Sequence, residues 1–310
     1  MLLLSSCSHP EGGGSSAGHR GVYHWKTTYN PTQWELQWIQ DHRVDRLYIK
    51  LFDVEPGDRN GYSEWRMVPV ATTRFEQMLP SGMDVVPVVY ITNDAIGQME
   101  EYNWYEQERY AKLLVDRIMA MMGDHWEGTL REVQLDCDWT ERTRDRYFGL
   151  CRYVGSLLED RGIELSGTVR LHQIEEEYLP FDRTVLMMYN TGRLQDRNTR
   201  NSILDHSDVA PYLRKNRSPQ LDSADIAWPA FGWGVAFHPN GRFAGLVHSL
   251  QLPDGKVDTL RVEWAEPKEI ERVKRDMPAT TGHTTIVYHL DSLNLSRYSH
   301  EEIEAIYNNR

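Results

Sequence analysis

The stretch that decides the fold is EVQLDCDWTE, residues 132–141. It has the pattern of a buried strand that ends in two carboxylates, Asp136 and Asp138. Because side chains alternate along a strand, both acids share one face, and the apolar residues of the other face are expected to pack against helices. Two acids on the inner face at a strand end favour a chemical site over a purely structural role.

Short apolar strands alternate with helical patterns along the rest of the chain. The pattern predicts eight strands, each followed by a helix, with one helix near residues 70–79 and the opening stretch as the fourth strand. That number of βα units predicts a closed (β/α)8 TIM barrel of class α/β, with an open doubly wound sheet as the alternative. Two turn motifs, Pro-Asn-Gly and Pro-Asp-Gly, predict a β-hairpin insertion over residues 235–263, after the seventh strand.

Composition limits the classes of partner. The chain has 310 residues, 26% of them charged and 40% apolar, which suffices for one large globular domain. Its net charge is −12 without a basic run, so nucleic acid is not expected as a partner. Its 10 Trp and 16 Tyr residues are typical of core filling, and any exposed ones are typical of sugar stacking.

The first seven residues, MLLLSSC, resemble the end of a secretory signal that carries a bacterial lipobox. The resemblance implies cleavage before Cys7 and a lipid on its thiol, which would anchor the protein to the membrane in the bacterial cell envelope. A complete signal has a charged start and a longer apolar run, so we expect the gene to begin further upstream. Gly and Ser dominate the next residues and predict a tether. We therefore divide the chain into residues 1–20, signal remnant and tether, and residues 21–310, one barrel domain.

In barrels of this kind the site lies at the carboxyl ends of the strands. Arg170 and His172 share a face of the fifth strand that meets Asp136 and Asp138 in a closed barrel, where Arg170 would keep one acid ionised. A purely structural ion network is the alternative. The candidate substrate-binding residues at the strand ends are Trp25, Asp53, Trp139, Arg170, His172, Asn190, Trp228, Trp233, His289 and Asp291.

Two short motifs resemble the chitinase-like family 18 glycoside hydrolases. That family carries D-x-x-D-x-D-x-E on its fourth barrel strand and M-x-Y-D on its sixth. Residues 136–139, DCDW, match the D-x-D-W core, and residues 187–190, MMYN, match M-x-Y-D, on the strands counted fourth and sixth. At residue level the resemblance covers these two stretches and otherwise only the barrel plan. An uncharacterised bacterial lipoprotein family that shares the barrel is the alternative.

The chain departs from the family pattern at three positions. Val133 stands at the first Asp, Thr140 at the catalytic Glu, and Asn190 at the last Asp. In the family the substrate's own N-acetyl group is the nucleophile, and the resemblance gives Asp138 the role of positioning it. The proton donor is then open among Glu141, Asp138 and Asp136, or it is absent.

The leading hypothesis is a lipid-anchored glycoside hydrolase that acts on an extracellular or envelope glycan by carboxylate acid/base catalysis, without metal or cofactor. Its candidate catalytic residues are Asp136, Asp138, Glu141 and Tyr189. The alternative is a non-catalytic glycan-binding lipoprotein on a degenerate barrel. The position of the Glu141 carboxylate distinguishes the hydrolase hypothesis from the binding hypothesis. A carboxylate that faces Asp138 across a groove supports catalysis, and one that points to solvent supports binding only.

A third hypothesis is a metal-dependent hydrolase. Metal sites in barrels need several converging ligands, but the chain has neither H-x-H nor H-E-x-x-H. The residues that would have to converge are His24, Asp53, Asp136, His172 and His289.

Overall fold

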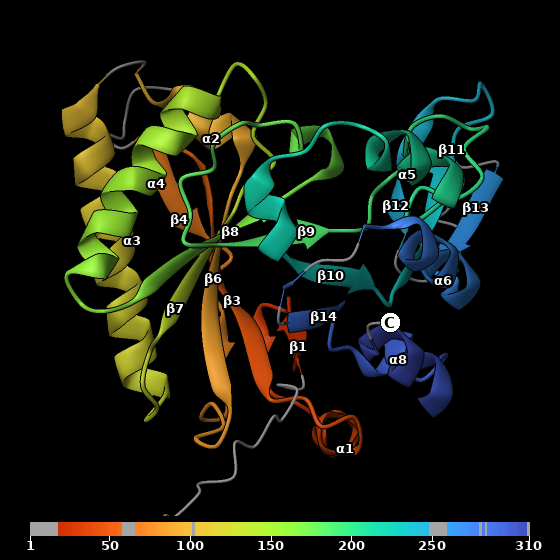
Figure 1. Ribbon diagram of the computed structural model, residues 1–310, viewed down its shortest axis with the longest axis horizontal. Helices are drawn as coiled ribbons and strands as arrows, with labels where there is room; N and C mark the ends of the chain where they lie inside the picture. Colours follow the sequence, from red (N-terminus) through yellow and green to blue (C-terminus); the bar gives the residue numbers. More distant parts are fainter. Residues whose placement is uncertain are drawn as a thin grey trace, which may run out of the picture.

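The computed structural model describes residues 18–57, 66–100, 103–247, 259–278, 281–282 and 284–308. Eight parallel strands form a closed barrel, because β1 (His19–His24) pairs both with β3 (Arg46–Pro56) and with β14 (Thr284–Tyr288). The remaining barrel strands, in chain order, are β6 (Asp84–Ile91), β7 (Glu132–Asp136), β8 (Glu164–Val169), β9 (Arg183–Met187) and β10 (Asp225–Pro229). The predicted (β/α)8 barrel is confirmed (Figure 1). Cys7 and nearly all of the predicted tether lie outside the described residues.

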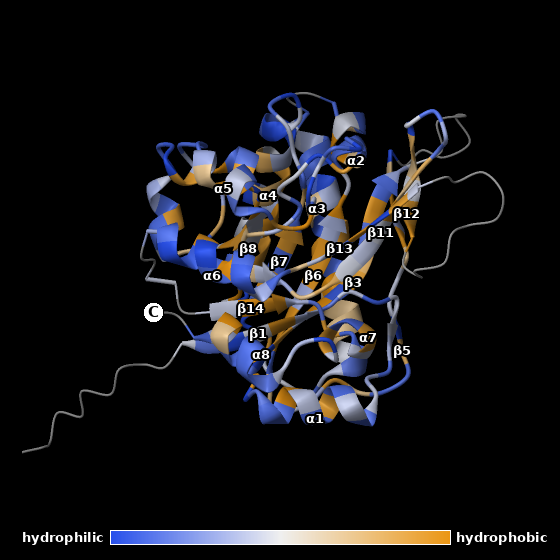
Figure 2. Cartoon of the chain, turned by 90° about the vertical axis from the view of Figure 1, so that its right-hand side faces the viewer, coloured by the Kyte–Doolittle hydropathy of each residue, from blue (hydrophilic) through white to orange (hydrophobic). Residues whose placement is uncertain are grey.

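Helices surround the barrel and turn their polar faces outward (Figure 2). Several begin where the sequence supplies a cap: Thr32 and Ser299 each form a capping box with a Glu three residues later, and Asp205 accepts from the Ser207 N–H. No helix among the described residues is long and apolar enough to cross a membrane. The helices are α1 (Gln33–Asp41), α2 (Asn93–Gln98), α3 (Trp104–His125), α4 (Arg144–Glu159), α5 (His206–Leu213), α6 (Pro267–Asp276), α7 (Ser292–Leu295) and α8 (His300–Tyr307).

Two strands are not followed by an α-helix in the described part of the chain. The prediction of a helix near residues 70–79 is wrong. Instead, β3 continues past the barrel to Pro56, where it pairs with the antiparallel strand β4 (Met67–Val70). The short strand β5 (Arg74–Phe75) then pairs with β2 (Thr28–Tyr29). β-branched Val68 and Val70 suit this extended edge, so tertiary pairing decided the conformation. Between β8 and β9 the chain forms only a 3-10 turn, Leu171–Gln173.

A small antiparallel sheet follows the seventh barrel strand. Its strands are β11 (Gly232–Phe237), β12 (Phe243–Val247) and β13 (Thr259–Trp264), in the order β12-β11-β13. The turn between β11 and β12 contains Gly241, whose φ of 80° suits glycine. Where the sequence predicted a hairpin over residues 235–263, the structure thus has a three-stranded sheet that begins at Gly232. The second predicted turn lies outside the described residues.

Paired charges fill the barrel interior at the amino ends of the strands. Arg46 Nη1 lies 3.0 Å from Glu132 Oε2, and Arg183 Nη2 lies 2.8 Å from Asp225 Oδ2. Above them the Tyr23 hydroxyl donates to Gln134 Oε1 over 2.6 Å. Because paired side chains occupy this interior, the carboxyl ends of the strands are where a ligand is expected.

Candidate functional site

Asp136, the last residue of β7, is one half of a buried ion pair. Its side chain is 3% exposed, and its Oδ1 accepts from Thr168 Oγ1 over 2.5 Å and from Arg170 Nη2 over 3.1 Å. Burial alone would lower the pKa of Arg170, but Asp136 and Tyr189 outweigh it and raise this pKa. The pairing predicted from the shared strand face therefore exists, and it places a permanent cation against Asp136.

Asp138 and Glu141 lie outside the strand. Since β7 ends at Asp136, the alternation no longer orients Asp138, whose side chain is 55% exposed and lies 3.4 Å from His172 Nε2. Glu141 is exposed in the turn before α4, and no hydrogen bond or ion pair joins it to Asp138 in the described residues. Thr140 helps to start α4: its N–H donates to Thr143 Oγ1 over 3.0 Å. A threonine hydroxyl, and no carboxyl group, thus stands where the sequence resemblance expected the family's acid.

Two predicted substrate-binding residues face away from the strand ends. Trp139 is buried and packs edge-on against Phe148 of α4, with ring centroids 5.2 Å apart. Trp228 is buried on the outer face of β10, where Lys274 Nζ of α6 lies 5.4 Å from its ring centroid. Because Asp225 of the same strand points inward, alternation directs Trp228 to the helices. Neither tryptophan is available to a ligand.

A pocket of about 570 Å³ opens at the carboxyl ends of β1, β9, β10 and β14. It brings together six of the predicted site residues, while Asp136, Asp138 and Glu141 are not part of its lining. The six are Trp25, Tyr189, Asn190, Trp233, His289 and Asp291, and the further lining residues are Phe231, Gly232, Trp264, Tyr288, Leu293, Asn294 and Arg297.

The pocket has aromatic walls. The ring of Tyr288 lies 4.8 Å from that of Tyr189 and 5.6 Å from that of Trp25, and Phe231 lies 5.2 Å from Trp233. Burial raises the pKa of both tyrosine hydroxyls well above the ordinary value, so both stay neutral. Tyr288 was missed as a site residue, although alternation in the eighth predicted strand directs it inward. Nothing in the sequence signals that Trp264 and Arg297 come to the same wall.

Met187 connects the pocket with the ion pair of Asp136 and Arg170. Its Sδ accepts from the Tyr189 hydroxyl over 2.6 Å and also contacts Arg170 Nη1. Asp136 is among the charges that raise the pKa of Tyr288. Met187 therefore links the ion pair to Tyr189, which lies in the wall of the pocket.

Polar groups line the mouth of the pocket. Asp291 caps α7 and lies 3.3 Å from Lys26 Nζ, and Trp233 Nε1 donates to Glu263 Oε2 over 2.8 Å. The Arg297 guanidinium stacks 3.4 Å from the Trp264 ring centroid. Asn190 has a φ of 57°, a region that Asn tolerates. Asp53 lies elsewhere, 3.0 Å from Lys50.

The five residues of the metal-hydrolase hypothesis do not converge. Within the described ranges, one group of three side chains has metal-binding spacing, and none of the five belongs to it. His24 is buried, and burial lowers its pKa to about 4. This hypothesis therefore receives no support from the geometry.

We predict that Asp136 and Asp138 differ sharply in their effect on stability. Asp136→Ala leaves the buried guanidinium of Arg170 without its carboxylate partner and should lower the free energy of unfolding by about 3–5 kcal/mol. Asp138→Ala removes a half-exposed group and should change it by less than about 1 kcal/mol. Urea denaturation of both variants measures this, and equal losses would contradict the assignment of Asp136 to a buried pair.

No model of a known protein family matches the chain, and no curated protein matches it. Solved structures do match. The spore cortex-lytic enzyme SleL of Bacillus megaterium QM B1551 aligns with a TM-score of 0.55 and 12% identity over 94% of this chain and 75% of that chain. SleL of Bacillus cereus gives 0.53 and 15% over 94% and 74%. A family 18 N-acetylglucosaminidase from Paenibacillus barengoltzii gives 0.51 and 11% over 94% and 100%. The chain thus has the barrel fold of the family 18 glycoside hydrolases, at 11 to 15% sequence identity to these structures.

Proposed function

We propose that the protein binds a glycan containing N-acetylglucosamine in the aromatic pocket and does not cleave it by the family 18 route. The observation that carries this proposal is the contrast between the two parts of the site. The pocket has walls suited to sugar rings, whereas Thr140, where the resemblance expects the family's acid, has a hydroxyl and no carboxyl group to donate a proton.

Sugar rings present apolar C–H faces and polar rims. Trp25, Trp233 and Tyr288 offer rings for stacking, while Asn190 and Asp291 offer groups for hydroxyl recognition at the mouth. The neutral phenol of Tyr288 is both a donor and an acceptor. This combination of aromatic area with few polar groups is suited to a neutral or weakly charged glycan.

The three carboxylates lack the environment of a general acid. A glycosidase acid keeps its proton because it is buried away from cations. Asp136 is buried but faces Arg170, while Asp138 and Glu141 are exposed. By the criterion set for Glu141, its exposure supports binding. The N-acetylglucosaminidase of the same fold supports N-acetylglucosamine as the sugar.

Trp233→Ala should weaken binding of a chito-oligosaccharide at least about tenfold, since it removes one stacking face of the pocket. Isothermal titration calorimetry of the folded variant measures the dissociation constant. Trp34→Ala is the matched control, because Trp34 is a half-exposed tryptophan on α1 outside the pocket. Equal affinities of the Trp233→Ala variant and the unaltered protein would contradict the proposed binding site.

Hydrolysis is the second candidate, and the contact between Asp138 and His172 favours it. This pair lies at the barrel mouth with its carboxylate accessible, so Asp138 could position a substrate N-acetyl group or transfer a proton. On this account the protein releases sugar from chito-oligosaccharides or peptidoglycan, and Asp138→Asn abolishes release while the fold stays intact. Sugar release by Glu141→Gln is measured beside it, to compare the second exposed carboxylate. Product analysis by mass spectrometry decides: no release by the unaltered protein, or full release by Asp138→Asn, removes this candidate.

Anchoring through a lipid on Cys7 is proposed from the sequence resemblance alone. The Gly/Ser-rich residues that follow would let the barrel reach a glycan in the cell envelope. Expressed in a bacterium behind a complete signal, the protein should partition into detergent, and Cys7→Ser should remain in the aqueous phase. Aqueous partitioning of both proteins would contradict the anchor.

A further inference from the structure

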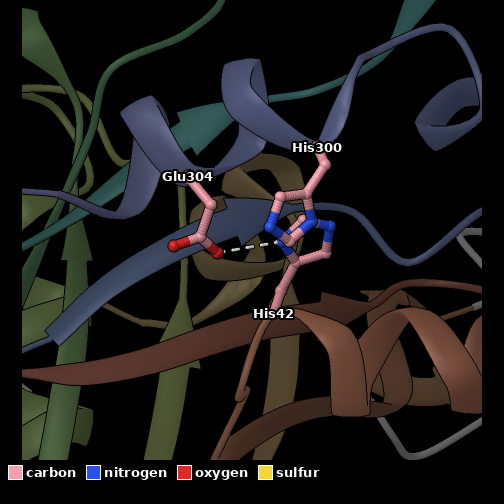
Figure 3. A group of neighbouring side chains, drawn as sticks. All are labelled: His42, His300 and Glu304. Atoms are coloured by element: carbon pink, nitrogen blue, oxygen red, sulfur yellow. Dashed lines mark hydrogen bonds and ion pairs between the residues drawn. The ribbon is translucent and has the colours of Figure 1, made fainter.

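We propose that His42, His300 and Glu304 form a binding site for a transition-metal dication such as Zn²⁺. Their candidate ligand atoms all lie within 4.8 Å of one another (Figure 3). His42 caps the end of α1, and His300 and Glu304 stand one turn apart on α8, so the three side chains come from opposite ends of the chain. The cluster lies apart from the aromatic pocket. His42 is followed by the amino end of β3, whereas the pocket opens at the carboxyl ends of the barrel strands.

The kinds of ligand select the kind of ion. Two imidazoles and one carboxylate suit Zn²⁺, Ni²⁺ or Co²⁺, whereas Mg²⁺ and Ca²⁺ prefer oxygen ligands alone. Residues four apart on a helix face the same side, so His300 and Glu304 can turn toward one ion. Three protein ligands leave the fourth tetrahedral position to water.

The carboxylate is already oriented toward the two rings. Glu304 Oε1 lies 3.1 Å from His42 Nδ1 and accepts from Arg20 Nη1 over 2.7 Å. Arg20 thereby holds Glu304 in place from behind, as an outer partner does for a metal-bound carboxylate. Among the described residues, Arg43 Nη2 lies 3.3 Å from the other oxygen, Oε2, and the Arg43 side chain is 73% exposed, so it can move away when a cation arrives.

One side chain must turn for the ion to bind. The His42 and His300 rings are stacked, with centroids 4.5 Å apart and planes at 22°. His42 is buried and held, but His300 is exposed in the first turn of α8, so its ring can rotate to direct a nitrogen at the ion. The two arginines oppose a cation, so we expect the affinity to be below that of a structural zinc site with cysteine ligands.

A bound ion would join α8 to α1 and, through Arg20, to β1. Because the ligands are brought together only in the folded chain, metal binding stabilises the fold. Saturating Zn²⁺ should therefore raise the thermal midpoint of unfolding by about 5 °C.

The test is titration of the untagged full chain, stripped of metal, with ZnCl₂ by calorimetry, together with thermal unfolding with and without Zn²⁺. We expect one ion per chain, at least tenfold weaker binding for His300→Ala, and loss of the thermal shift in this variant. His206→Ala is the matched control, since His206 also contacts an acid, Asp276, at 2.7 Å on the surface. It should bind Zn²⁺ like the unaltered protein.

Two outcomes overturn the site. One is absence of Zn²⁺ binding by the unaltered chain, and the other is equal affinity in His300→Ala, which would place the ion elsewhere. Because His300 is exposed, its replacement leaves the core intact, and circular dichroism verifies the fold. Glu304→Gln keeps the shape of the side chain but removes its charge, so this variant should also lose the ion.

Discussion

The need to pair charges inside the barrel governs the rest of the structure. At the amino ends of the strands, Arg46 and Arg183 pair with Glu132 and Asp225, and at the other end Arg170 pairs with Asp136. A buried charge that loses its partner is strongly destabilising, so these residues are bound to one another. The inward faces of the strands therefore contribute structure, and the aromatic pocket lies outward of them, at the rim of the barrel.

This constraint separates the two acids of the opening stretch. Asp136 lies inside the barrel and belongs to the ion network, which was the structural alternative for this pair. Asp138 lies two residues further, beyond the end of β7, half-exposed beside His172. A single alternating pattern in the sequence thus yields one buried and one accessible carboxylate, because the strand ends between them.

The glycoside hydrolase-like barrel has an aromatic pocket at its open end, and Thr140 stands where the resemblance to family 18 expects an acid. Thr140 contributes a backbone donor to the start of α4, and Glu141 is turned to solvent. On the proposed function, the aromatic walls of Trp25, Tyr288 and Trp233 would bind a sugar without such an acid. Recognition and cleavage are separate demands, and our proposal assigns only the first to the pocket.

Much of the fold was predictable because alternation and helical periodicity are local signals. The barrel strands follow from them. The pairing of β4 with the extended end of β3 was not predictable, since it depends on a long-range edge. Alternation places Trp228 outside only once Asp225 is known to point inward. Trp264 and Arg297 reach the pocket from β13 and the segment after α7, whose meeting no local pattern reveals.

The central claim is that the pocket binds a glycan without family-type cleavage. A crystal structure of the protein soaked with chitotetraose tests it most directly. The account predicts an intact sugar chain with a ring stacked on Trp233 or Tyr288 and no carboxylate of Asp136 or Glu141 at a glycosidic oxygen. Density for a sugar chain outside this pocket, or for a cleaved chain with Asp138 or Glu141 at the new end, would contradict it.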